Sequence, residues 1–259
     1  MPTLRVKPAE EQATQGRMDE RLTHDHMLGG RILLAQPDSG LRAAIDPVLL
    51  AAAVPARPGA RVLDLGTGSG VAALCLARRV AALRIAGLEL QADLAALARR
   101  NAALNGLAMD VVRGDVAAVP FAARVFDHVM ANPPFLPARM GTLPPSRGKR
   151  LAVGEGEAGL ARWVEAALAL VKPRGSVTFI HRADRLAELL SALGRGAGAI
   201  VVFPLWPRLG EPAKRVLAQA RRGVAAPLRL AAGLVLHEAD GRYTEAAESV
   251  LRDAAALTL

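Results

Sequence analysis

Apolar and polar positions alternate in blocks from residue 61 onward, and each block has the length of a strand or of a helix. Short apolar runs predict buried strands, and longer runs with apolar residues three or four positions apart predict helices that cover them. The predicted strands are 61–65, 83–90, 109–115, 126–132 and 176–181, and the predicted helices are 71–80, 93–106 and 157–171. This alternation predicts an α/β fold with a mostly parallel, doubly wound sheet.

The last part of the chain departs from the alternation. Two apolar runs, 199–206 and 213–221, follow each other across a short loop with no helix between them. Such a pair predicts two antiparallel strands at one edge of the sheet. We see no internal repeat and expect residues 26–259 to form a single domain with an N-terminal extension.

The N-terminal region shows less pattern. Residues 1–25 are polar and aperiodic, so we expect a flexible tail there. The apolar stretch 44–54 then predicts a helix, in which Asp46 suits the N-cap and Pro47 the first helical position.

A glycine-rich turn, VLDLGTGSG, joins the first strand of the alternating region to its helix. Gly66, Gly68 and Gly70 permit a tight turn and let a ligand approach the backbone at a helix N-terminus. The spacing is G-x-G-x-G, and Val71 stands where the dinucleotide pattern requires a small residue. Asp64 would repel a pyrophosphate but would suit a ligand that carries a positive charge.

Polar side chains stand at the carboxyl ends of four predicted strands, namely Asp64, Glu89, Asp115 and Asn132. Open α/β sheets bind their ligands at this edge. Glu89 is placed to hold ribose hydroxyls, and Asp115 could accept a hydrogen bond from an adenine amino group, although a turn or a cap would also explain Asp115. A cationic centre, a ribose and an adenine together describe S-adenosylmethionine.

The fourth strand ends in the sequence NPPF. A residue before proline is extended, so Asn132 is held outstretched, and neither Pro133 nor Pro134 offers an N–H. The Asn132 side-chain oxygen and the Pro133 carbonyl could accept both hydrogens of a planar –NH2 group, which would localise electron density on its nitrogen. Phe135 would stack on a flat target. The motif therefore predicts methylation of a planar amine.

VLDLGTGSG, GLEL, GD and NPPF, in this order and spacing, resemble the class I S-adenosylmethionine-dependent methyltransferases that modify exocyclic amines. Outside this core, LGGRILLAQPDSGLRAAIDPVLLAAAV, GEPAKRVLAQARRG and LVLHEADGRYT resemble the bacterial family that makes N6-methyladenosine at position 37 of a valine tRNA. The resemblance implies a Rossmann-like methyltransferase fold and a tRNA substrate. By resemblance, the segment around Asp46 lies over the methionine end of the cofactor.

The expected site has two parts. The cofactor-binding residues are expected to be Asp64, Gly66, Thr67, Gly68, Gly70, Glu89, Leu90, Asp115, Val116 and Asn132. The catalytic residues are expected to be Asn132, Pro133, Pro134 and Phe135. No metal is expected, because His24 and His26 lack a nearby third ligand.

The charge of the chain favours a polyanionic partner. Lys and Arg outnumber Asp and Glu by 33 to 24, for a formal net charge of +9, which favours nucleic acid. The long loop after NPPF carries Arg139, Arg147, Lys149 and Arg150, which we expect to bind RNA. A second basic cluster is predicted near the C-terminus, from Arg208, Lys214, Arg215, Arg221 and Arg222.

Composition also bears on the setting of the protein. The single cysteine, Cys75, lies in a predicted helix and suits a small core side chain in a reducing, cytoplasmic environment. No apolar run is long enough to span a membrane. The oligomeric state stays open.

Other functions remain possible at this level. Guanine N2 of ribosomal RNA and the amide of a protein glutamine are also planar amines. A non-catalytic RNA-binding module is a further alternative, which the intact NPPF disfavours. A dinucleotide-dependent oxidoreductase is disfavoured by Asp64 and Val71.

Overall fold

A computed structural model describes residues 22–38, 44–134 and 159–259. Its central feature is a nine-stranded sheet in the order β10-β8-β9-β7-β6-β3-β4-β5, with β11 pairing with β8. The strands are β3 (Arg61–Leu65), β4 (Arg84–Glu89), β5 (Met109–Arg113), β6 (Phe126–Ala131), β7 (Val171–Arg182), β8 (Ala197–Trp206), β9 (Arg215–Arg222), β10 (Arg229–Leu230) and β11 (Leu234–Val235).

The α/β prediction with a mostly parallel sheet is confirmed. Strands β5, β4, β3, β6 and β7 run parallel to one another, and β9 runs antiparallel to both β7 and β8. The predicted antiparallel pair is therefore β8 and β9. It does not form the outermost edge, because the short strands β10 and β11 pair with the far side of β8.

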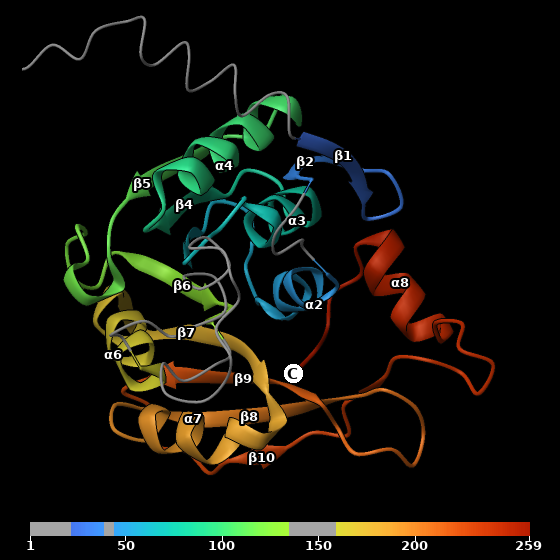
Figure 1. Cartoon of the computed structure of the whole chain (residues 1–259). Coiled ribbons are helices and arrows are strands. Elements are labelled where there is room, and N and C mark those ends of the chain that lie inside the picture. Colours follow the sequence, from blue (N-terminus) through green and yellow to red (C-terminus); the bar gives the residue numbers. More distant parts are fainter. Residues whose placement is uncertain (1–21, 39–43, 135–158) are drawn as a thin grey trace, which may run out of the picture.

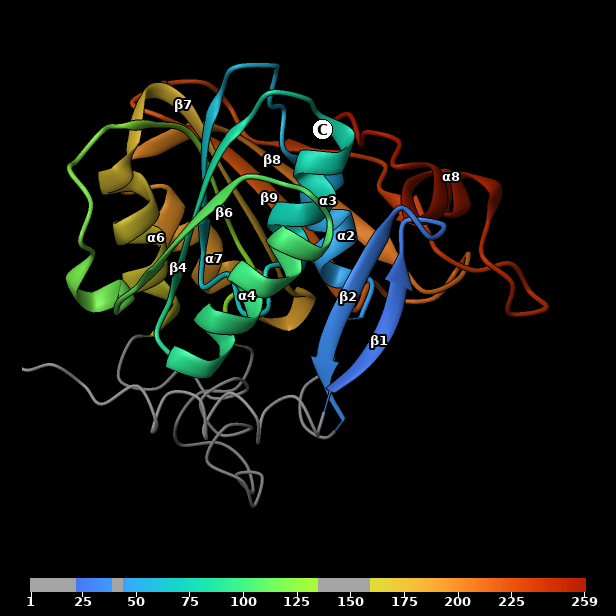
Figure 2. The same ribbon diagram turned by 90° about the horizontal axis from the view of Figure 1, so that it is seen from above.

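Helices cover both faces of the sheet (Figures 1 and 2). One apolar core lies under α2 (Asp46–Ala53), α3 (Val71–Arg79) and α8 (Glu245–Asp253), and α4 (Ala92–Leu104) lies on the same side. A second core lies under α6 (Leu160–Leu170), α7 (Leu186–Leu193) and the short 3-10 helices η1 (Val116–Ala118) and η2 (Ala183–Arg185). Both cores are built largely of Leu, Val and Ala. None of the helices in the described part has the length and apolarity to cross a membrane.

The N-terminal hairpin, β1 (Leu22–Met27) with β2 (Ile32–Pro37), is held to α4 by two asparagines. Asn105 accepts from the Leu33 N–H at 2.9 Å and donates to the Leu33 carbonyl at 2.7 Å. Asn101 makes the same pair of bonds with Ala35, at 2.9 and 3.1 Å. Four helical residues rise about 6 Å, close to two residues of a strand, so the two amides mimic a neighbouring strand along β2.

Two predictions for the N-terminal region need correction. Residues 22–25 belong to β1 and are not part of a flexible tail; residues 1–21 lie outside the described residues. Helix α2 begins at Asp46, but its N-cap is Ile45, and no side chain of the described residues caps the helix. The Asp46 carboxylate instead accepts a hydrogen bond at 3.0 Å from Arg215 Nε, 169 residues away, because a cation offers it a stronger partner than a backbone N–H.

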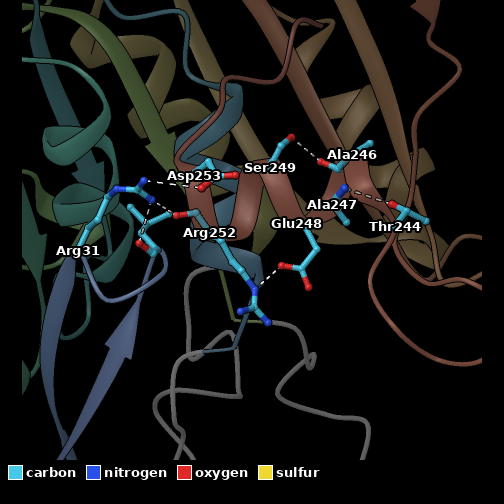
Figure 3. A network of polar contacts seen from close by, with 9 residues as sticks. Arg31, Thr244, Ala246, Ala247, Glu248, Ser249, Arg252 and Asp253 are labelled. Atoms are coloured by element: carbon cyan, nitrogen blue, oxygen red, sulfur yellow. Dashed lines mark hydrogen bonds and ion pairs between the residues drawn. The ribbon is translucent and has the colours of Figure 1, made fainter.

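The C-terminal helix meets the turn of the hairpin (Figure 3). Arg31 donates to the Arg252 carbonyl at the end of α8 and forms an ion pair of 3.6 Å with Asp253. A side chain at Gly29 would come within 2.9 Å of the same carbonyl, so the two segments pack closely. The first and last described elements of the chain are therefore joined.

The parallel strands β3 to β7 give the sheet two unlike edges. We call the edge where these strands end the carboxyl edge, and the edge where they begin the amino edge. Leu65 pairs with Ala131 and Glu89 with Arg113, so the residues that follow β3, β4, β5 and β6 meet at the carboxyl edge. The predicted site residues that the structure describes lie there.

Candidate active site

The glycine turn that follows β3 is fixed to β4 by its backbone. The N–H groups of Gly66 and Thr67 both donate to the Leu88 carbonyl at 2.9 Å. Gly66, Gly68 and Gly70 have φ values of +75°, +58° and +90°, which residues with a side chain rarely adopt. A Cβ on Gly68 would meet no atom of the described residues within 4 Å. The turn is thus anchored from below and open to a ligand above Gly68.

Asp64 lies beneath this turn and is only 2% exposed. The Thr67 hydroxyl donates to its Oδ2 at 2.6 Å. Burial raises the pKa of Asp64 to about 6, although the hydrogen bonds from Thr67 and from the Ala73 N–H oppose this shift. In this structure Asp64 therefore supports the turn through Thr67. Its expected contact with a cationic ligand stays a prediction.

Glu89 ends β4 with both carboxylate oxygens engaged by backbone donors. Oε2 accepts from the Gly68 N–H and Oε1 from the Gln91 N–H, each at 2.9 Å. Burial raises the pKa of Glu89, and the backbone bonds work in the other direction. Each oxygen retains a lone pair, so the carboxylate is oriented beside the glycine turn and can still accept from a ligand hydroxyl.

The residues that follow β5 also lie at the carboxyl edge, beside those that follow β4. Asp115 is exposed, and its Oδ1 accepts from the Ala117 N–H at 2.8 Å as the cap of η1. Val116 is buried to 9% exposure, whereas Leu90, after β4, is 48% exposed. The capping role noted as an alternative for Asp115 is thus present. A contact between Asp115 and an adenine stays a prediction.

Asn132 stands at the end of β6, next in register to Gly66. Its Oδ1 atom is buried and has no hydrogen-bond partner among residues 22–38, 44–134 and 159–259. Pro133 is buried and Pro134 is partly exposed. A buried carbonyl oxygen without a donor costs about 1–3 kcal/mol, so such an atom indicates an acceptor reserved for a ligand.

Several expected site residues lie outside the described residues: Phe135, Arg139, Arg147, Lys149 and Arg150. The second basic cluster is divided by the fold. Lys214 and Arg215 lie at the start of β9, at the carboxyl edge, whereas Arg221 and Arg222 end β9 at the amino edge. Because β9 is extended, these two groups are roughly 20 Å apart. The prediction of one cluster was wrong.

Trp163 of α6 touches the glycine turn and was not among the expected site residues. A Cβ on Gly66 would lie 2.5 Å from Cη2 and 2.7 Å from Cζ3 of its ring, so only glycine fits there. The Trp163 Nε1 atom is buried and has no hydrogen-bond partner in the described part of the chain. A tryptophan within an apolar helical stripe is typical of a core position, so the local sequence gave no signal of this contact.

The comparisons with known proteins agree with this geometry. A family model described as "Methyltransferase small domain" matches residues 42–142, which include the glycine turn and Asn132. The tRNA1(Val) (adenine(37)-N6)-methyltransferase of Aeromonas hydrophila is 31% identical over 208 residues, which cover 79% of this chain and 86% of that protein. The chain belongs to this methyltransferase family. The sequence-based assignment is thereby confirmed.

Two other similar proteins have different names. The release factor glutamine methyltransferase of Chlorobaculum tepidum is 30% identical over 193 residues, covering 69% of this chain and 65% of that protein. The crystal structure of a predicted O-methyltransferase from Agrobacterium tumefaciens is 27% identical and superposes with a TM-score of 0.68, covering 82% of this chain and 98% of that chain. Both support a methyltransferase fold, and they differ in the acceptor.

The carboxyl edge fits S-adenosylmethionine, the cofactor of this methyltransferase. The space above Gly68 admits a ligand, and Glu89 presents a buried carboxylate beside it. Leu90 offers an exposed apolar surface next to Glu89, which suits the face of an adenine ring. A carboxylate for hydroxyls, an apolar wall and an open glycine turn match the parts of this cofactor.

Proposed function

We propose that this methyltransferase acts on N6 of an adenine in tRNA. The observation that carries the proposal is the buried Oδ1 of Asn132 at the end of β6, beside the glycine turn, which finds no hydrogen-bond partner among the residues that the structure describes. The name of the Aeromonas hydrophila relative supports adenine as acceptor, and the net charge of +9 supports a nucleic acid. With tRNA as its substrate, the enzyme would act in the cytoplasm.

The cofactor would be held by residues of three strand ends. Glu89 would accept from the ribose hydroxyls, and Leu90, Val116 and Asp115 would surround the adenine. The glycines of the turn would let the cofactor approach the backbone, with Asp64 and Thr67 fixing the turn from below. Bound in this way, S-adenosylmethionine supplies an electrophilic methyl group.

The acceptor amine would be oriented by Asn132 and Pro133. The Asn132 Oδ1 and the Pro133 carbonyl accept its two hydrogens, which localises the nitrogen lone pair and directs it at the methyl group. The nitrogen oriented in this way would accept the methyl group that the sulfonium of the cofactor would supply, and one N–H proton would then pass to solvent. Phe135 would stack on the base, and the basic residues of the following loop would contact phosphates.

Isotopic labelling tests the proposal directly. The protein is incubated with unmodified tRNA and S-adenosylmethionine carrying a labelled methyl group, and the digested nucleosides are identified by mass spectrometry. We expect labelled N6-methyladenosine. If none forms on any RNA fraction, the proposal fails.

A protein acceptor is the second candidate, favoured by the similarity to the release factor glutamine methyltransferase. The amide of glutamine is also a planar –NH2 group that Asn132 and Pro133 could bind. The same labelling applied to release factors distinguishes the two, because label in a glutamine of the protein and none in RNA would assign the chain to this second function.

A further inference from the structure

Four arginines gather where α6 meets β7, at the amino edge of the sheet. Arg124 donates its backbone N–H to the Ala169 carbonyl at 3.1 Å, and the Arg222 side chain donates to the same carbonyl at 3.3 Å. The Arg221 side chain donates to the Arg174 carbonyl at 3.2 Å. We call Arg124, Arg174, Arg221 and Arg222 the amino-edge cluster.

The amino-edge cluster has no acidic partner in the described part of the chain. The nearby Asp127 is occupied by Lys172 and by the Arg61 N–H. Within the described ranges, no carboxylate forms an ion pair with any of the four arginines. Arg124 and Arg222 both donate to the Ala169 carbonyl. Burial lowers the pKa of the Arg222 guanidinium, and the charge of Arg124 lowers it further.

Further arginines lie along the same amino edge of the sheet. Arg61 and Arg84 begin β3 and β4 as paired neighbours, and both are exposed. At the carboxyl edge, by contrast, the described cations are largely matched by acids: Arg215 pairs with Asp46 and Arg182 with Asp184. Much of the unbalanced positive charge of the described chain therefore lies away from the active site.

The separation of the two edges can be gauged along β6. Arg124 precedes Asn132 by eight residues, and the strand between them is extended, so they lie about 26 Å apart. A nucleotide bound at Asn132 cannot reach the amino-edge cluster. A longer RNA that continues along the side of the domain can.

We propose that the amino-edge cluster binds the phosphate backbone of the substrate RNA at a distance from the methylated nucleotide. Guanidinium groups with free donors match phosphate geometry, and a row of phosphates would relieve the repulsion between them. This inference rests on the proposed function, because the RNA is the one whose adenine enters the active site.

The test compares two double variants of the full-length protein. R124Q/R174Q removes two exposed arginines whose side chains form no hydrogen bond or ion pair with the described residues. R242Q/R252Q removes the same amount of charge at exposed arginines that are each paired with an acid near α8. Binding to tRNA is measured by filter binding without cofactor, at several salt concentrations.

We expect R124Q/R174Q to bind tRNA at least about tenfold more weakly at low salt. The slope of log affinity against log salt should fall by about two, so the difference from the wild type should shrink about tenfold between roughly 50 and 200 mM salt. R242Q/R252Q should bind nearly as the wild type does. At saturating tRNA, the turnover of R124Q/R174Q should stay at the wild-type level.

A second measurement uses a short RNA hairpin to test whether the contact lies far from the methylated nucleotide. A stem of about four base pairs beside the acceptor adenine spans on the order of 13 Å, too short to reach the amino edge. We expect wild type and R124Q/R174Q to bind this hairpin equally. Unchanged tRNA binding by R124Q/R174Q, or an equal loss on tRNA and hairpin, would overturn the inference. If the wild-type protein bound tRNA but methylated no adenine in it, this result would contradict the proposed function and not the phosphate contact.

Discussion

The Oδ1 atom of Asn132 is an acceptor that the fold buries without using in its described part. Replacing Asn132 with alanine removes this unsatisfied atom, so the free energy of unfolding should rise by about 1 kcal/mol. The same change removes one of two acceptors for the amine, so turnover should fall about 100- to 1,000-fold while cofactor still binds. Thermal unfolding and single-turnover methylation measure the two effects.

Asn105→Ala is the matched control. The Asn105 amide joins the end of α4 to β2 through two hydrogen bonds with Leu33 and donates a third to the Asn101 carbonyl within α4. Its loss should therefore destabilise the fold and leave turnover at saturating substrates nearly unchanged. If Asn132→Ala kept near-normal turnover, or behaved as Asn105→Ala does, the role given to Asn132 would be wrong.

The protonation of Asp64, beneath the glycine turn, should make the stability of the protein depend on pH. The folded pKa of Asp64, about 6, lies above the ordinary value of 3.8 for an aspartate, so the folded state binds the proton more tightly than the unfolded state does. Stability from this group is present below about pH 4 and is lost as the pH rises to about 6, by roughly 3 kcal/mol. The Tm difference between wild type and Asp64→Asn should therefore fall across this window. A difference that does not vary with pH would refute the assignment.

At the scale of elements, α6 reaches the glycine turn through Trp163. Because the Trp163 ring fills the space beside Gly66, Trp163→Ala should loosen the turn and raise KM for S-adenosylmethionine about tenfold, equivalent to about 1.4 kcal/mol. Trp163→Phe should keep most of the contact. In the W206F variant, where Trp163 is the remaining tryptophan, cofactor titration should change the emission. An unchanged spectrum in W206F would show that the turn and Trp163 are not coupled to the cofactor.

The elements that the sequence predicts are those whose residues contact near neighbours. The apolar runs and the glycine turn predict β3 to β6, α3 and α4, and Asn105 with Gly106 correctly marks the end of α4. The predictions fail where a contact with a residue far away in the sequence determines the local structure. Residues 22–25 form a strand because β2 pairs with them. Asp46 does not cap α2, because its carboxylate accepts a hydrogen bond from Arg215 instead. Neither partner lies within the local pattern.

The same limit applies to the site. Glu89 and Asn132 could be predicted because each ends a parallel strand, and parallel strand ends meet at one edge. Trp163 could not, because its contact with Gly66 crosses from one helix to a turn almost a hundred residues away. The charged residues of β9 were predicted as one cluster, because a list of arginines does not show that an extended strand separates its ends.

At the scale of the whole molecule, the β1–β2 hairpin contacts α8, and the residues that follow α8 contact α2. Arg31 contacts the end of α8, and the Leu257 N–H donates to the Ala52 carbonyl at 2.9 Å. Figure 3 shows Arg31 directed at Arg252 and Asp253, with Thr244 capping the other end of the helix. A cation at a helix C-terminus satisfies free carbonyls and opposes the negative end of the helix dipole. The segments far apart in sequence therefore stabilise each other.

Arg31→Ala should lower the free energy of unfolding by about 1 kcal/mol, because it removes the bond to the Arg252 carbonyl and the ion pair with Asp253. For a chain of this size, that corresponds to about 2–4 °C in Tm. Arg242→Ala is the control, since the Arg242 side chain is 83% exposed and pairs with the nearby Asp240, so the Tm of this variant should stay within about 1 °C of the wild type. Calorimetry measures both. Equal Tm values for the two variants would mean that the hairpin and α8 do not stabilise each other through Arg31.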